Sequence, residues 1–103
     1  MAEEQVTVIA TIKAKEGKAD TVLEELLALI EPTRSEAGCI NYDLHRMSDD
    51  PNCFVFHENW KSREALDRHL AKPYIADFIA KADELLAEPV DIKLLSRIPV
   101  SGK

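Results

Sequence analysis

The chain has 103 residues, of which 46% are hydrophobic and 31% charged, and its formal net charge is −6. This composition is typical of one folded domain and excludes a disordered or membrane-embedded chain. The negative charge, without a long run of Lys and Arg, also excludes a nucleic-acid binder that tracks phosphates and a binder of anionic membranes. We expect one domain over 1–103, with its core over 5–98 and a short tail over 99–103, in a cytoplasmic protein without a signal peptide.

The first half of the chain predicts a strand, a helix and a second strand. Residues 5–13 alternate apolar and polar side chains, which indicates a strand, and 16–18 form a turn. Residues 19–33 carry apolar side chains at helical spacing. We expect Gly38 to end this helix in the left-handed conformation, before a second strand over 39–47.

The second half repeats the pattern after a turn rich in Asp, Pro and Asn. A third strand covers 53–60, and the hydroxyl of Ser62 is placed to cap a helix. We expect this helix to be interrupted at Pro73 and to end before Pro89. A last strand follows over 90–98.

The order β-α-β-β-α-β predicts a ferredoxin-like α+β fold, with a four-stranded antiparallel sheet and the helices on one face. The other face still carries apolar side chains, and an exposed apolar sheet face usually marks an interface. We therefore expect a homodimer whose two sheets face each other, as in a dimeric α/β barrel.

The register of the central hairpin decides which side chains meet under the helices. Pairing Met47 with Cys53 puts three pairs on the more apolar face, opposite His69: Tyr42–Glu58, Ile40–Trp60 and Leu44–Phe56. The result is an apolar cleft with a carboxylate, a phenol and an imidazole, which is typical of a small-molecule pocket. The same register separates Cys39 and Cys53 by roughly 25 Å, so we expect two free thiols.

Four segments resemble the antibiotic biosynthesis monooxygenase (ABM) domain family, and more narrowly its quinol monooxygenase branch: TRSEAGCINYDL at 33–44, FHENW at 56–60, EALDRHL at 64–70 and KPYIADF at 72–78. The resemblance extends over about residues 6–97. It implies a dimeric α/β barrel and oxidation of phenols, hydroquinones or polycyclic aromatics by molecular oxygen, without a cofactor. Relatives also include haem-degrading enzymes and an isomerase of a phosphorylated autoinducer signal, so the resemblance defines fold better than reaction.

The haem-degrading relatives carry an asparagine on the first strand and a tryptophan and a histidine on the second helix. The corresponding residues here are Ala10, His69 and Ile79. Because an isoleucine stands where those relatives have the iron ligand, the resemblance disfavours haem. We expect no cofactor.

His69 is the candidate general base, since an imidazole titrates near neutrality. Glu58 is the candidate catalytic carboxylate that orients it. Two structural alternatives remain open: Glu58 holds the helix on the sheet through His69, or it forms an ion pair with Arg34, Arg46 or Arg68.

Four aromatic residues are candidates for substrate binding. Trp60 would stack on an aromatic ring, and Tyr42 or Tyr74 would hydrogen-bond its oxygen. Phe78 would complete the cleft, although packing in the core is the simpler explanation of both Trp60 and Phe78. The substrate would be a small aromatic molecule, with oxygen as the second reactant.

Three further polar residues, Asp43, His45 and His57, are predicted on the opposite sheet face. Imidazoles and a carboxylate are transition-metal ligands, but polar residues at a wet dimer interface explain them more simply. We expect no metal site there.

Two other functions remain open. The first is an isomerase of a small phosphorylated carbonyl compound, which would need the cations Arg34 and Arg46 in the cleft. The second is a dimeric protein that binds small aromatics without turnover.

Overall fold

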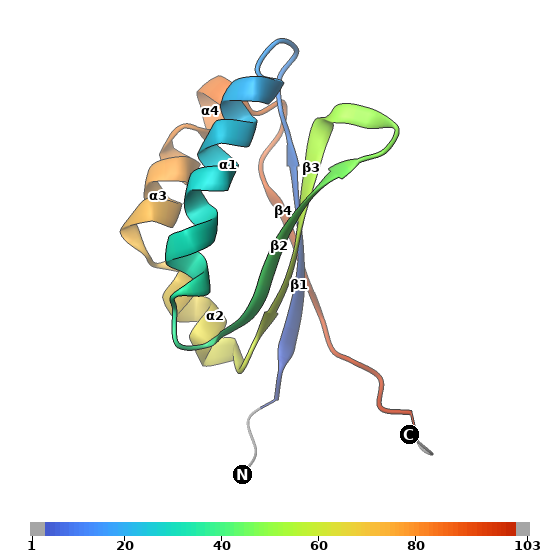
Figure 1. Cartoon of the computed structure of the whole chain (residues 1–103), viewed down its shortest axis with the longest axis vertical. Helices are drawn as coiled ribbons and strands as arrows, with labels where there is room; N and C mark the ends of the chain where they lie inside the picture. Colours follow the sequence, from blue (N-terminus) through green and yellow to red (C-terminus); the bar gives the residue numbers. More distant parts are fainter. Residues whose placement is uncertain (1–3, 101–103) are drawn as a thin grey trace.

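The computed structural model describes residues 4–100 (Figure 1). Within them the elements are β1 (Val6–Lys13), α1 (Ala19–Arg34), β2 (Cys39–Met47), β3 (Asp50–Trp60), α2 (Arg63–Leu70), α3 (Pro73–Ala80), α4 (Ala82–Leu85) and β4 (Asp91–Leu95). The strands form one antiparallel sheet in the order β2-β3-β1-β4. The helices cover one face of this sheet and leave the other open. The predicted ferredoxin-like arrangement is confirmed.

The break between α2 and α3 follows the sequence signals. The Ser62 hydroxyl accepts a hydrogen bond from the Ala65 N–H at 3.1 Å, which caps α2. Pro73 occupies the first turn of α3, where its missing N–H leaves no hydrogen bond unmade. No helix of the described residues is long and apolar enough to cross a membrane.

The segment after α3 differs from the prediction of a helix that continues toward Pro89. The helix ends at Ala80, and the short α4 is followed by extended backbone at Leu86. Leu86 forms an isolated bridge with Ala14, because the chain turns back to pair with the residues that follow β1. β4 is also shorter than the predicted strand over 90–98.

Gly38 has a different role from the predicted one. Among the described residues only Gly17 has a positive φ, at 80°, so the left-handed helix stop at Gly38 is wrong. A Cβ at Gly38 would lie 2.3 Å from the Cβ of Ala65. Gly38 is therefore needed for the close approach of α2, not for backbone rotation.

The hairpin register is confirmed at its centre, where the pairs are Tyr42–Glu58 and Leu44–Phe56. It is wrong at both ends. A bulge places Cys39 opposite Trp60 and leaves Ile40 48% exposed, and Met47 pairs with Asp50 across a turn shorter than predicted. Because the irregularities lie outside the central pairs, the predicted face stays under the helices.

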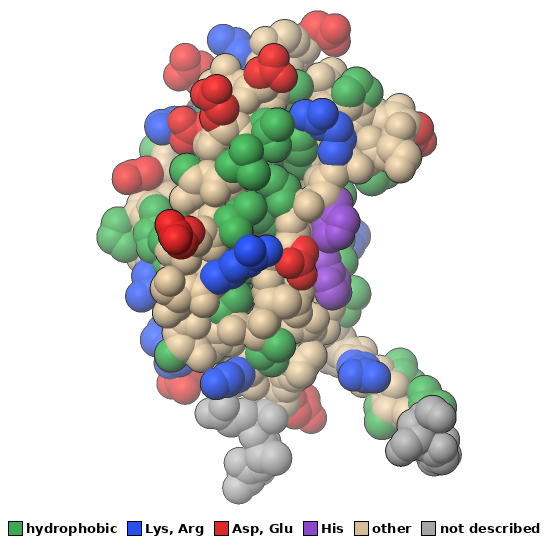
Figure 2. All heavy atoms as spheres, in the orientation of Figure 1, with side chains coloured by type: hydrophobic (Ala, Val, Ile, Leu, Met, Phe, Trp, Pro, Cys, Tyr) green, Lys and Arg blue, Asp and Glu red, His purple; other side chains and the backbone are tan. Residues whose placement is uncertain are grey.

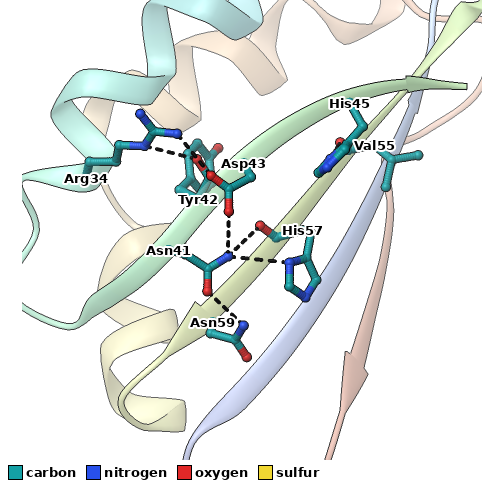
Figure 3. Close-up of polar contacts among 8 residues, drawn as sticks. All are labelled: Arg34, Asn41, Tyr42, Asp43, His45, Val55, His57 and Asn59. Carbon is teal, nitrogen blue, oxygen red and sulfur yellow. Dashed lines mark hydrogen bonds and ion pairs between the residues drawn. The ribbon is translucent and has the colours of Figure 1, made fainter.

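The open sheet face carries a connected set of polar side chains (Figure 3). Asn41 donates to Asp43 at 3.0 Å and to the His57 carbonyl at 3.1 Å, and Asn59 donates to Asn41 at 2.8 Å. Arg34 reaches this set from the end of α1 through its ion pair with Asp43 at 3.1 Å. These hydrogen bonds connect β2 to β3 on the open face, and the Arg34 side chain connects β2 to the end of α1.

Candidate functional site

A cavity of about 190 Å³ lies between the helices and the sheet. Most of its lining is apolar, and the polar side chains that reach it are Tyr42, Glu58 and His69. β2 supplies Tyr42, β3 supplies Glu58 and α2 supplies His69. The cleft that the sequence predicted under the helices is thus present as an apolar cavity with three polar groups.

The cavity has a buried inner end and a more exposed rim. The side chains at the inner end, Tyr42, Phe56, Glu58, His69 and Phe78, are each at most 5% exposed. Leu70, Ile79 and Ile92 are 40–48% exposed and lie on α2, α3 and β4. A molecule that enters past this apolar rim meets the three polar groups in a region with little access to water.

His69 is held by a carboxylate that sequence analysis did not select. Its Nδ1 lies 2.9 Å from Oε2 of Glu36, whose side chain is 8% exposed. The indole of Trp60 packs against the ring at 4.5 Å between centroids, and Tyr42 meets it edge-on at 5.5 Å. The hypothesis that Glu58 orients His69 through a hydrogen bond is wrong in this structure, because Glu36 occupies that position.

Glu58 has a different partner. Its Oε1 accepts a hydrogen bond from the indole N–H of Trp60 at 2.9 Å. None of the predicted ion pairs is present: Arg34 pairs with Asp43, Arg46 lies over Phe54, and Arg68 pairs with Glu64. Burial raises the pKa of Glu58 to about 7, with a smaller contribution from the charge of Glu36, while the Trp60 N–H opposes the rise. Near neutral pH this carboxyl is therefore partly protonated and is then a hydrogen-bond donor to the cavity.

Burial also determines the state of the other two polar groups. It lowers the pKa of His69 below 6.5, although the hydrogen bond and charge of Glu36 oppose this change. The ring is consequently neutral at pH 7 and able to accept a proton. Burial raises the pKa of Tyr42, so its phenol stays protonated.

The remaining candidate residues divide between cavity and core. Phe78 lines the cavity and is also buried. Trp60 is fully buried and packs behind His69, which agrees with the core interpretation. Tyr74 lies in the first turn of α3, and its hydroxyl faces Glu36 and the Pro32 carbonyl rather than the cavity.

Glu36 escaped sequence analysis because it belongs to the connection between α1 and β2. Such a segment has no hydrophobic period that would assign a face to each side chain. The only local signal was the neighbouring Gly38, which marks a close approach of two backbones without identifying its partner.

The sequence also predicted that the chain has no metal site and no disulfide. The described residues contain no group of three or more His, Cys, Asp or Glu side chains that could hold a metal ion. Cys39 and Cys53 are both free thiols, as predicted. Burial raises the pKa of Cys39 to about 11, so it remains a thiol rather than a nucleophilic thiolate.

Residues 5–81 match the family described as "Antibiotic biosynthesis monooxygenase". The chain belongs to this family. An uncharacterized protein of Synechocystis, sll1783, is 39% identical over 93 residues, which are 90% of this chain and 63% of that protein. The chain thus spans less than two thirds of that relative.

Two further similar proteins align over most of this chain and over most of their own length. A Bacillus subtilis protein provisionally named as a monooxygenase, YcnE, is 36% identical over 81% of this chain and 87% of its own length. The crystal structure of PA3566 from Pseudomonas aeruginosa matches with a TM-score of 0.89 and 37% identity, over 96% of this chain and 99% of that one. The ABM fold thus extends over nearly the whole chain.

Proposed function

We propose that this chain is a cofactor-independent monooxygenase of the quinol type, which oxidises quinol, phenolic or polycyclic aromatic small molecules with molecular oxygen. The observation that supports it best is a neutral, buried imidazole, His69, on the wall of an apolar cavity. Membership of the ABM family supports the same reaction class.

The proposed reaction begins with removal of a phenolic proton by His69. The resulting phenolate is electron-rich enough to transfer one electron to oxygen, and the two radicals combine to form a C–O bond at the ring. Loss of water from this hydroperoxide converts the carbon to a carbonyl. A hydroquinone and one oxygen molecule thus give a hydroxyquinone and one water, and all four electrons that reduce oxygen come from the substrate.

Glu58 and Tyr42 serve this reaction as hydrogen-bond donors. Protonated Glu58 donates to a ring oxygen or to the departing hydroxide, and the phenol of Tyr42 orients the substrate from the opposite strand. The apolar remainder of the wall, including Phe78, binds the ring.

The isomerase alternative is less well supported. No Lys or Arg lines the cavity of His69, so a phosphate group would find no cation there. Arg34 and Arg46 instead line a separate groove of about 440 Å³ between α1 and β2. Figure 2 shows this groove as an apolar strip flanked by cationic side chains.

We also propose that two copies pair through their open sheet faces. Leu95 is 46% exposed there, diagonal to the partly buried Ile9 of β1, and the polar set around Asn41 lies to one side of them on β2 and β3. Apolar residues with polar residues at their edge are usual at protein interfaces. Sedimentation velocity should give a dimer at micromolar concentration, and a monomer would contradict this proposal.

The decisive experiment for the activity is oxygen uptake with a panel of hydroquinones and polyphenols after metal removal. We expect uptake above the autoxidation blank, and a loss of about 100-fold or more in His69→Ala, in line with the removal of a general base. His45→Ala is the matched control, because His45 is exposed on the opposite face. Uptake equal to the blank across the panel would refute the proposed function.

The pH dependence of uptake provides a further check on His69. The base must be unprotonated, so the initial rate should rise with pH through a pKa below 6.5. The position of this rise should be the same in His45→Ala as in the wild type.

A further inference from the structure

A single carboxylate oxygen connects His69 to Tyr74. Oε2 of Glu36 lies 2.9 Å from His69 Nδ1 and accepts a hydrogen bond from the Tyr74 hydroxyl. Glu36 comes from the α1–β2 connection, His69 from the end of α2 and Tyr74 from the start of α3. The α1–β2 connection therefore meets two consecutive helices, more than 30 residues further along the chain, at one atom.

The chemistry of this contact determines which ring nitrogen carries the proton. An ionised carboxylate can only accept hydrogen bonds, so a neutral imidazole that bonds to it must be protonated at Nδ1. Nε2 is then left with a lone pair. Within the described part of the chain the side-chain hydrogen bond of His69 is made through Nδ1, and the ring lines the cavity.

The second hydrogen bond keeps Glu36 in place. A carboxylate on a flexible side chain has several rotamers, and the Tyr74 hydroxyl fixes the one in which Oε2 faces the imidazole. Tyr74 also lies 3.3 Å from the carbonyl of Pro32, in the last turn of α1. The hydroxyl thus holds the Glu36 oxygen close to two helices.

We propose that Glu36, held by Tyr74, is a positioning residue that fixes His69 as the Nδ1–H tautomer and so presents Nε2 as the base to the cavity. This inference rests on the proposed function for its catalytic meaning, but the tautomer itself is independent of any reaction. Neither Glu36 nor Tyr74 touches the substrate in this arrangement, because neither lines the cavity.

The tautomer can be measured directly by ¹⁵N NMR of the imidazole without substrate. At pH 8, where His69 is neutral, we expect a pyrrole-type shift at Nδ1 and a pyridine-type shift at Nε2 in the wild type. The shifts also depend on the charged and titratable groups near the ring, which are Glu36, Lys72, Tyr42, Glu58 and Tyr74. A pyridine-type shift at Nδ1 in the wild type would overturn the proposal, and this measurement requires no variant to fold.

Glu36→Gln removes the obligate acceptor while keeping the shape of the side chain. Its amide N–H can donate to Nδ1, so we expect the proton to move to Nε2 in part or in whole. Glu31→Gln is the matched control, because Glu31 is an exposed carboxylate on the last turns of α1. An unchanged tautomer in a folded Glu36→Gln protein would also overturn the proposal.

Kinetics then separate a positioning role from a structural one. Glu36→Gln should lower kcat about 10- to 100-fold, as does loss of a partner that orients a functional histidine, with KM changed by less than about twofold. Tyr74→Phe should lower kcat less. If no substrate is turned over although NMR shows the expected tautomers, the proposed function fails and the tautomer assignment stands. If His69 is the base but Glu36→Gln retains full kcat, the positioning role is refuted.

Discussion

The protonation state of Glu58 can be tested through protein stability, independently of any substrate. Glu58→Gln replaces the carboxyl with a neutral group of the same shape that still accepts the hydrogen bond of the Trp60 indole. The variant therefore mimics the protonated form of Glu58 at every pH. Comparison with the wild type isolates the free energy of burying the charge.

The expected magnitude follows from the pKa shift. Burial raises the pKa of Glu58 from 4.5 to about 7. One pKa unit corresponds to about 1.4 kcal/mol, so the charged form destabilises the folded state by about 3 kcal/mol. Because the folded-state pKa is the higher one, the stability that the protonated carboxyl provides is complete below pH 4.5 and is lost as pH rises to about 7.

Urea unfolding at pH 5 and pH 8 measures this effect at one protein concentration. We expect the wild type to lose about 2–3 kcal/mol relative to Glu58→Gln between these pH values, since other titrating groups cancel in the comparison. Glu24→Gln, an exposed change on α1, is the control and should follow the wild type. Parallel pH dependence of wild type and Glu58→Gln would refute the assignment of a buried, partly protonated carboxyl.

Two other substitutions test packing around the site by urea unfolding. Gly38→Ala should destabilise the fold by about 1–3 kcal/mol, because its Cβ would lie 2.3 Å from that of Ala65. Adding Ala65→Gly should recover part of this loss, and strictly additive effects would contradict the contact. Thr33→Val should stabilise by about 1 kcal/mol, because the Thr33 hydroxyl is buried without a hydrogen-bonding partner. A destabilised Thr33→Val would mean that this hydroxyl is satisfied in solution.

The sequence alone predicted the fold because local signals agreed with the global pattern. Alternation over 54–60 assigned Phe56, Glu58 and Trp60 to one face, and the structure confirms that all three are buried. The cap at Ser62 and the break at Pro73 fixed where the helices begin. Register errors were confined to the hairpin ends, where a bulge and a short turn leave no period to follow.

The candidate site was predicted in its location but not in its connections. The helical and strand periods predicted that His69 and Glu58 face the same cavity, because a period indicates the side of a helix or strand from which a side chain projects. It does not report which of two carboxylates lies within 3 Å of an imidazole. Glu58 was the obvious choice, since its position on an apolar strand face is unusual.

Only the tertiary structure decided that Glu36 holds His69. The two residues are 33 positions apart, and Glu36 lies in a connection whose path depends on how closely α2 approaches Gly38. Side-chain hydrogen bonds between such segments form after the backbone is packed, so they leave no periodic trace in the sequence. The sequence by itself determined the sheet, its covered face and the placement of Glu58 and His69 at the cavity. The packing of loops and helices decided which side chains contact one another.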